Sequence, residues 1–142
     1  MNYKQIKQMK FFTIKELTKS DIAKRSKINN VPTIQEKNNL ISLVENVLDP
    51  LREAYGKPII VTSGFRCERL NKLINGSKTS QHKTGHAADI RSVEDTREEN
   101  KKIFDLIQKL NLPFDQLINE YDYDWIHVSY SPRNRKQILN IK

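Results

Sequence analysis

The sequence predicts an α+β fold in which a small, mainly antiparallel sheet is flanked by helices. Amphipathic helical patterns fill the first part of the 142-residue chain, and short β-branched strand patterns gather in the later part. Most loops between those strands are too short to hold the crossover helix that a parallel pair usually needs. Because no internal repeat or low-complexity linker divides the chain, we expect a single domain over residues 1–142.

Two short sequence patterns predict where the first helices begin. Thr13 and Thr33 are each followed three residues later by a glutamate, Glu16 and Glu36. In such a capping box the threonine and the glutamate satisfy backbone amides at the helix start. A further short helix is expected over residues 21–26, before a turn of two asparagines.

The helix after Thr33 has the strongest apolar stripe in the chain. We expect it to end at Gly56. Pro50 interrupts it, because proline has no amide hydrogen to donate, so we expect either a kink there or a new start with Asp49 as the cap. The stripe consists of Leu40, Ile41, Val44, Val47, Leu48, Leu51 and Tyr55.

The second half of the chain contains most of the strand patterns. Helical turns are expected over residues 67–75, and a longer helix is expected to begin at Asp95 or Thr96. The buried stripe of that helix would be Ile103, Phe104, Ile107 and Leu110. We expect strands over residues 58–62, 87–91, 116–119, 125–130 and 137–141.

The net charge of +8 is concentrated at the two ends of the chain. Residues 1–28 contain eight lysines and arginines against two acidic residues, and residues 133–142 contain four against none. The part between them has thirteen basic and fifteen acidic residues. Since we find no nucleic-acid-reading motif, we interpret the basic ends as solvated and expect no nucleic-acid partner. An anionic cell wall would suit these ends equally well.

Cysteine content and hydropathy restrict the setting of the protein. Cys67 is the only cysteine, so no intrachain disulfide can form. No segment approaches the ~20 apolar residues of a membrane span, and residues 1–10 lack the apolar core of a secretory signal. We expect a monomer that is made in the cytoplasm and acts at the cell wall after release or export.

The histidines lie in two short segments that both have features of a metal site. His82 lies among small and turn-forming residues that lead into a strand, and His127 lies inside an apolar strand, where an unpaired polar ring would be costly. Neutral imidazole and carboxylate are suitable zinc ligands, and three protein ligands are typical of a catalytic zinc site.

The choice of the third ligand lies between His86 and Asp89. His82 and His86 have the spacing of a helical pair, but the turn-forming residues between them and the strand that follows disfavour a helix. In an extended segment, His86 and Asp89 point to opposite faces and therefore compete. Local pattern favours His82, Asp89 and His127 over a set that includes His86, without deciding between them.

Three motifs stand out in the chain: Ser63-Gly64-Phe65-Arg66, Ser80-x-His82-x-x-Gly85-x-Ala87-x-Asp89 and Trp125-x-His127-x-Ser129. Together they resemble the zinc D-alanyl-D-alanine carboxypeptidases, family fifteen of the metallopeptidases. The similarity extends from about Phe12 into the tail at residues 135–137, and it is greatest to the small single-domain members common in phages and prophages. It implies a Hedgehog/DD-peptidase-like fold and a zinc ion held by His82, Asp89 and His127.

The resemblance also implies catalytic roles. Asp124, three residues before the last histidine ligand, matches the carboxylate that takes a proton from water and delivers it to the leaving amine. Residues three apart in a regular strand face opposite ways, so Asp124 can reach the metal only from a turn or bulge, and Glu120 is the reserve base. Arg66 matches the arginine that holds the substrate carbonyl oxygen as it gains charge. Ser80 matches a substrate-contacting serine, with a simple turn-capping role as the alternative.

The resemblance implies zinc-dependent hydrolysis of a peptide bond in peptidoglycan stem peptides, either D-alanyl-D-alanine or L-alanyl-D-glutamate. The alternative is a zinc-containing module that has lost catalysis, as in the related Hedgehog signalling domains, and that binds the cell wall or serves as a phage structural part. The presence of Asp124 and Arg66 beside a complete ligand set favours the enzyme. A nucleic-acid binder ranks third and would show steep salt dependence without a metal requirement.

Overall fold

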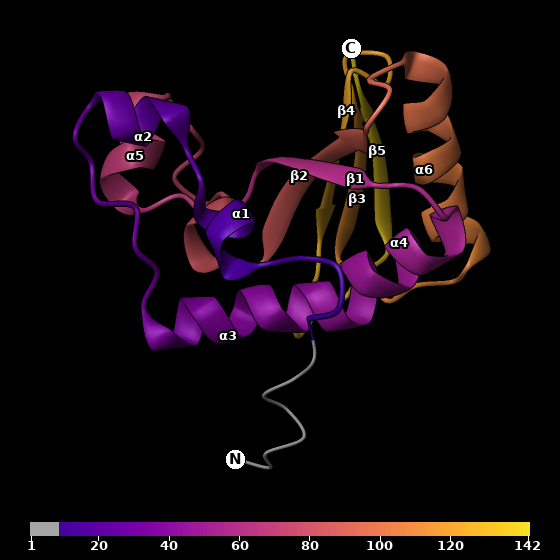
Figure 1. Ribbon diagram of the computed structural model, residues 1–142, viewed down its shortest axis with the longest axis horizontal. Coiled ribbons are helices and arrows are strands. Elements are labelled where there is room, and N and C mark those ends of the chain that lie inside the picture. Colours follow the sequence, from indigo (N-terminus) through magenta and orange to yellow (C-terminus); the bar gives the residue numbers. More distant parts are fainter. Residues whose placement is uncertain (1–8) are drawn as a thin grey trace.

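The computed structural model of the chain describes residues 9–142 and has an α+β architecture (Figure 1). The helices are α1 (Ile14–Thr18), α2 (Asp21–Arg25), α3 (Ile34–Leu43), α4 (Asp49–Tyr55), α5 (Glu68–Leu73) and α6 (Arg97–Lys109), with a π-helical turn η2 (Val44–Leu48) and a 3-10 turn η3 (Gln81–Thr84). The strands are β1 (Ile59–Ser63), β2 (Ala87–Ser92), β3 (Gln116–Glu120), β4 (Trp125–Ser129) and β5 (Gln137–Ile141). The predicted α+β class is confirmed.

The five strands form one sheet in the order β1-β2-β4-β3-β5. The pairs β1–β2, β2–β4 and β4–β3 are antiparallel, and only β5 is parallel to its neighbour β3. The expectation of a mainly antiparallel sheet is therefore confirmed. β1 lies at one edge of the sheet and pairs with β2 alone.

The register of the central strands gives the sheet two different faces. Ile90 pairs with Ile126 and Leu117 pairs with Val128, and these buried side chains lie on one face. Since side chains alternate along a strand, the residues between them point to the other face. Asp89 lies there, opposite His127.

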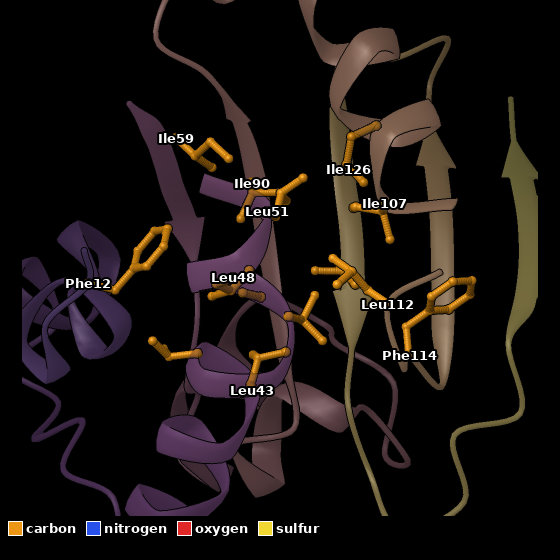
Figure 2. Close-up of a cluster of buried hydrophobic side chains, with 14 of the residues drawn as sticks. Phe12, Leu43, Leu48, Leu51, Ile59, Ile90, Ile107, Leu112, Phe114 and Ile126 are labelled. Carbon is orange, nitrogen blue, oxygen red and sulfur yellow. The ribbon is translucent and has the colours of Figure 1, made fainter. Parts of the chain in front are cut away.

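The apolar face of the sheet packs against α6 and against the long helical segment formed by α3, η2 and α4. Figure 2 shows Leu48 and Leu51 from that segment and Ile107 from α6 meeting Ile90 and Ile126 of the sheet. All five side chains are fully buried, so close packing holds this face of the sheet rigidly against the helices. The opposite face, which carries polar groups, is left available for a site.

The sequence prediction of capped helices is confirmed. The Thr13 and Thr33 side chains each accept a hydrogen bond from the amide of the third helical residue, and Glu16 and Glu36 bond back to the threonine amides. Thr96, and not Asp95, caps α6.

The predicted interruption at Pro50 takes the form of a π-helical turn. α3 continues through η2 into α4 without a break, and the wider turn accommodates the missing amide of Pro50. Asp49 does not cap α4, because its carboxylate accepts hydrogen bonds from the amides of Lys10 and Phe11. The alternative of a new helix start with Asp49 as the cap is therefore wrong.

The remaining helices gather at the carboxyl end of β1. α1, α2 and α5 lie together on the left of Figure 1, beside the point where β1 leaves the sheet. α1 contacts both α3 and β1. Among the described helices, none is long and apolar enough to cross a membrane. Residues 1–8, on which the expectation about a secretory signal partly rests, lie outside the described part of the chain.

Candidate metal centre and active site

Three potential metal ligands converge on the polar face of the sheet. One ligand atom from each of His82, Asp89 and His127 lies within 4.8 Å of the other two. Asp89 Oδ1 lies 3.2 Å from His82 Nε2 and 3.0 Å from His127 Nδ1. The two imidazole rings meet edge to face with their centroids 5.1 Å apart. Two nitrogens and one oxygen therefore surround a common point.

Strand pairing brings two of these ligands together. Asp89 of β2 and His127 of β4 are direct partners in the antiparallel register, so their side chains stand next to each other on one face. His82 comes from the η3 turn before β2 and is 2% exposed. Strand pairing thus fixes Asp89 next to His127, although they lie far apart in the sequence, and the tight turn η3 adds His82 to the site.

The segment after β1 orients the His82 ring. The Gly64 carbonyl oxygen lies 2.7 Å from His82 Nδ1, and the Arg66 amide donates a 3.0 Å hydrogen bond to the His82 carbonyl. A proton on Nδ1 that is bonded to Gly64 leaves the Nε2 lone pair facing Asp89, as in many metal-binding histidines. The Gly64 backbone packs so closely on the Leu17 carbonyl that a Cβ would not fit.

A second glycine shapes the turn that carries His82. Gly85 has a φ of +78° and ends η3 in the left-handed conformation. Its backbone packs against the carbonyl of Glu36 at the start of α3, where a side chain would collide. Only glycine meets both conditions without strain, and this explains its place three residues after His82.

Electrostatics favour an ionised Asp89. Burial alone would raise the pKa of its carboxyl, but His82 and His127 hold that pKa well below its usual range. The side chain is only 14% exposed, so its charge needs a cationic partner. The two-nitrogen, one-oxygen donor set, with its ring-orienting carbonyl, fits a zinc ion with room for a further ligand.

His86, the competing ligand, lies outside the cluster. Its Nδ1 lies 2.6 Å from the Thr84 hydroxyl, and its ring lines a separate cavity with Tyr130 and Ser131. Burial lowers the pKa of the His86 imidazole, and the charge of Asp115 opposes that shift. Asp89 therefore belongs to the cluster, and His86 lies in a different cavity.

Glu120 lies at the end of β3 on the face that carries the cluster. It pairs with Trp125, and Ile118 pairs with His127, so all four side chains share one face of the hairpin. Trp125 Nε1 donates a 3.0 Å hydrogen bond to Glu120 Oε2. Burial raises the pKa of the Glu120 carboxyl, as does the charge of Asp89.

Asp124 lies in the turn between β3 and β4, and its side chain is exposed. Within residues 9–142 its carboxylate makes no hydrogen bond or ion pair, and only its backbone is held: the amide donates to Glu120 and the carbonyl accepts from Asn100. The turn is tight, with left-handed φ values of 52°, 55° and 62° at residues 121–123. The Asp124 side chain is thus exposed and without a partner in the described residues, and its role as the base stays a prediction.

Arg66 lies beside the cluster with an unused donor. Its Nε atom is buried and has no hydrogen-bond partner among the described residues. Burial lowers the pKa of the guanidinium, and the negative charges of Asp89 and Glu120 oppose that shift. Arg66 and Asp89 line the same cavity, where the guanidinium can donate a hydrogen bond to a ligand's oxygen.

Ser80 is the N-cap of η3, and its hydroxyl accepts a hydrogen bond from the His82 amide at 3.2 Å. This contact matches the capping alternative, and it supports the turn that carries a ligand. The substrate contact stays a prediction.

The sequence did not predict a buried hydrogen-bond network around Asp115, next to η3. The Asp115 carboxylate accepts hydrogen bonds from Arg135 and from Gln81 Nε2, the side chain next to His82 in the chain. Arg135 holds the pKa of the Asp115 carboxyl well below its usual range against the opposing effect of burial. The only sequence signal was the arginine in the tail, whose partner could not be identified before the fold was known.

Comparison with known proteins agrees with this geometry. A search of curated proteins gave no match. The family model for peptidase M15 matches residues 10–129, which include His82, Asp89 and His127. The chain therefore belongs to the peptidase M15 family of zinc-dependent peptidases.

Proposed function

We propose that this M15 peptidase hydrolyses a peptide bond in the stem peptides of bacterial peptidoglycan. The observation that carries the proposal is the convergence of His82, Asp89 and His127. The Glu120 carboxylate lies on the His127 face of the hairpin, and the cationic Arg66 lines the same cavity as Asp89. We assign the three converging residues as the zinc ligands. A module that only binds zinc would have no need of the other two groups.

Glu120 is the group we assign to proton transfer. It lies on the His127 face of the hairpin, and it is only half buried, so a water molecule can reach it. Its carboxylate can take a proton from water and pass it to the leaving amine. Asp124, the residue that the family resemblance indicated, is exposed in the turn and is not supported as the base.

Arg66 is the group we assign to the substrate carbonyl oxygen. Arg66 lines the same cavity as Asp89, where its guanidinium can donate to an oxygen that becomes negative during the reaction. Zinc, when bound, supplies a Lewis acid that lowers the pKa of water and polarises a carbonyl. The bond cut is either D-alanyl-D-alanine or L-alanyl-D-glutamate, and we propose that the protein meets it at the cell wall after release or export.

Mass spectrometry of digested peptidoglycan fragments tests this function. Zinc-loaded protein should release either a terminal D-alanine or a fragment cut between L-alanine and D-glutamate. Chelation of the metal should stop the release, and added zinc should restore it. Protein that retains zinc and binds cell walls but releases no fragment would instead support the non-catalytic module.

A further inference from the structure

A groove of about 650 Å³ leads away from the candidate active site. Asp89 and Arg66 line it together with residues of α2. Its remaining surface comes largely from β1 and from apolar side chains, among them Ile22 and Ile74. The groove therefore connects residues of the candidate active site with the surface of β1 and α2.

The edge of β1 lines this groove with its backbone. Four consecutive residues, 60–63, contribute to the lining. The pairing of β1 with β2 shifts register between Val61 and Ser63, so the regular part of this strand edge is residues 59–61, and the lining continues past it to residue 63. β1 pairs with β2 on its other side, and no described segment makes backbone hydrogen bonds to its outer edge. Such an edge is a template for another strand.

The groove also carries an excess of positive charge. Lys19, Arg25 and Arg66 line it, and none of the three forms an ion pair within residues 9–142. Of the two acids in the lining, Asp89 is committed to the histidines and Asp21 is exposed on α2. A ligand with a free carboxylate would balance this charge.

We propose that this groove holds the substrate peptide in extended form as an added strand on β1, with a carboxylate of the peptide facing Lys19 and Arg25. The inference rests on the proposed function for the identity of the peptide. Backbone pairing would supply affinity independent of side chains, and it suits a substrate of small residues. The register of the added strand would set which peptide bond stands beside Asp89 and Arg66.

Binding can be measured apart from catalysis. A synthetic stem peptide with both the L-alanyl-D-glutamate and the D-alanyl-D-alanine bond is titrated calorimetrically into zinc-loaded Glu120→Gln protein, and mass spectrometry checks that the peptide stays intact. In that background, replacement of Lys19 and Arg25 by alanine should weaken binding about tenfold and reduce its salt dependence, because two exposed ion pairs are lost. Lys15→Ala with Lys24→Ala is the matched control, since these lysines are exposed, one on α1 and one on α2, and lie outside the groove lining. Equal affinity in the test pair, or equal loss in both pairs, would overturn the proposal.

N-methylation of the peptide tests the strand pairing. Only alternate amides of an added strand face the partner edge, so methyl groups at alternate positions should weaken binding roughly threefold or more, and those between should be tolerated. A uniform effect along the peptide would exclude strand addition. If wild-type protein cleaves stem peptides but alanine at Lys19 and Arg25 leaves the binding affinity unchanged, this inference is overturned and the proposed function stays intact. Binding with the alternating pattern but no cleavage by wild-type protein would do the reverse.

Discussion

Glu120→Gln tests which carboxylate transfers the proton. The amide keeps the shape of the side chain and retains an oxygen that can accept the hydrogen bond from Trp125 Nε1, so the hairpin should stay folded. It cannot take up a proton at neutral pH. Loss of a general acid or base typically costs ~10²–10⁴ in rate. At about 1.36 kcal/mol per tenfold change, the barrier should rise by roughly 2.7–5.4 kcal/mol.

Asp124→Asn is the matched control, because it makes the same chemical change four residues further along the chain. Its side chain is exposed and has no partner in the described residues, so turnover should stay within about twofold of wild type. The assay is steady-state hydrolysis of a synthetic stem peptide, with zinc content determined for each protein. An inactive Asp124→Asn beside a normally active Glu120→Gln would refute the assignment and show that the turn brings Asp124 to the metal.

Three further results are expected. Arg66→Ala should keep zinc and lower turnover by ~10²–10³, and Arg66→Lys should restore only part of it, because lysine lacks the planar fork; kinetics in which only the Michaelis constant rises would make Arg66 a substrate anchor. Asp115→Asn should lower the free energy of unfolding by roughly 1.5–3 kcal/mol at neutral pH. Because Arg135 lowers the Asp115 pKa, this stabilisation is fully present above the unfolded pKa of about 3.9 and is lost as the pH falls below it. Denaturant unfolding should therefore show that the difference in free energy of unfolding between wild type and variant disappears in acid. A difference that stays constant with pH contradicts the reasoning. Asn100→Ala should cost about 2–3 kcal/mol in thermal unfolding, because the buried Asn100 accepts from the Ser92 amide and donates to the β3–β4 turn; a loss below about 0.5 kcal/mol would show that the turn holds without it.

Local signals in the sequence predicted most of the fold. The capping boxes at Thr13 and Thr33 and the strand patterns depend on residues close together in the chain, and the structure confirms both. Pro50 signalled an interruption, but the choice between a kink, a new start and a π-helical turn depended on packing. Asp49 turned away from the cap position because distant backbone amides at Lys10 and Phe11 compete for its carboxylate.

The candidate site was less predictable where it depends on pairing between strands. Residue spacing could not choose between Asp124 and Glu120, because the choice depends on where the β3–β4 hairpin turns. Once the register pairs Glu120 with Trp125, the face shared with His127 follows from simple alternation. The edge of β1 and the charges at Lys19 and Arg25 come together only in three dimensions, and no motif marks them.

Zinc content of purified variants tests the central claim most directly. Wild-type protein should bind one zinc ion per chain, and His82→Ala or Asp89→Ala should lose it, because each removes a converging ligand. His86→Ala should retain zinc, since its ring lies in a separate cavity. Elemental analysis by mass spectrometry gives the stoichiometry without any assumption about substrate. Loss of zinc from His86→Ala with full retention in Asp89→Ala would contradict the proposed metal centre.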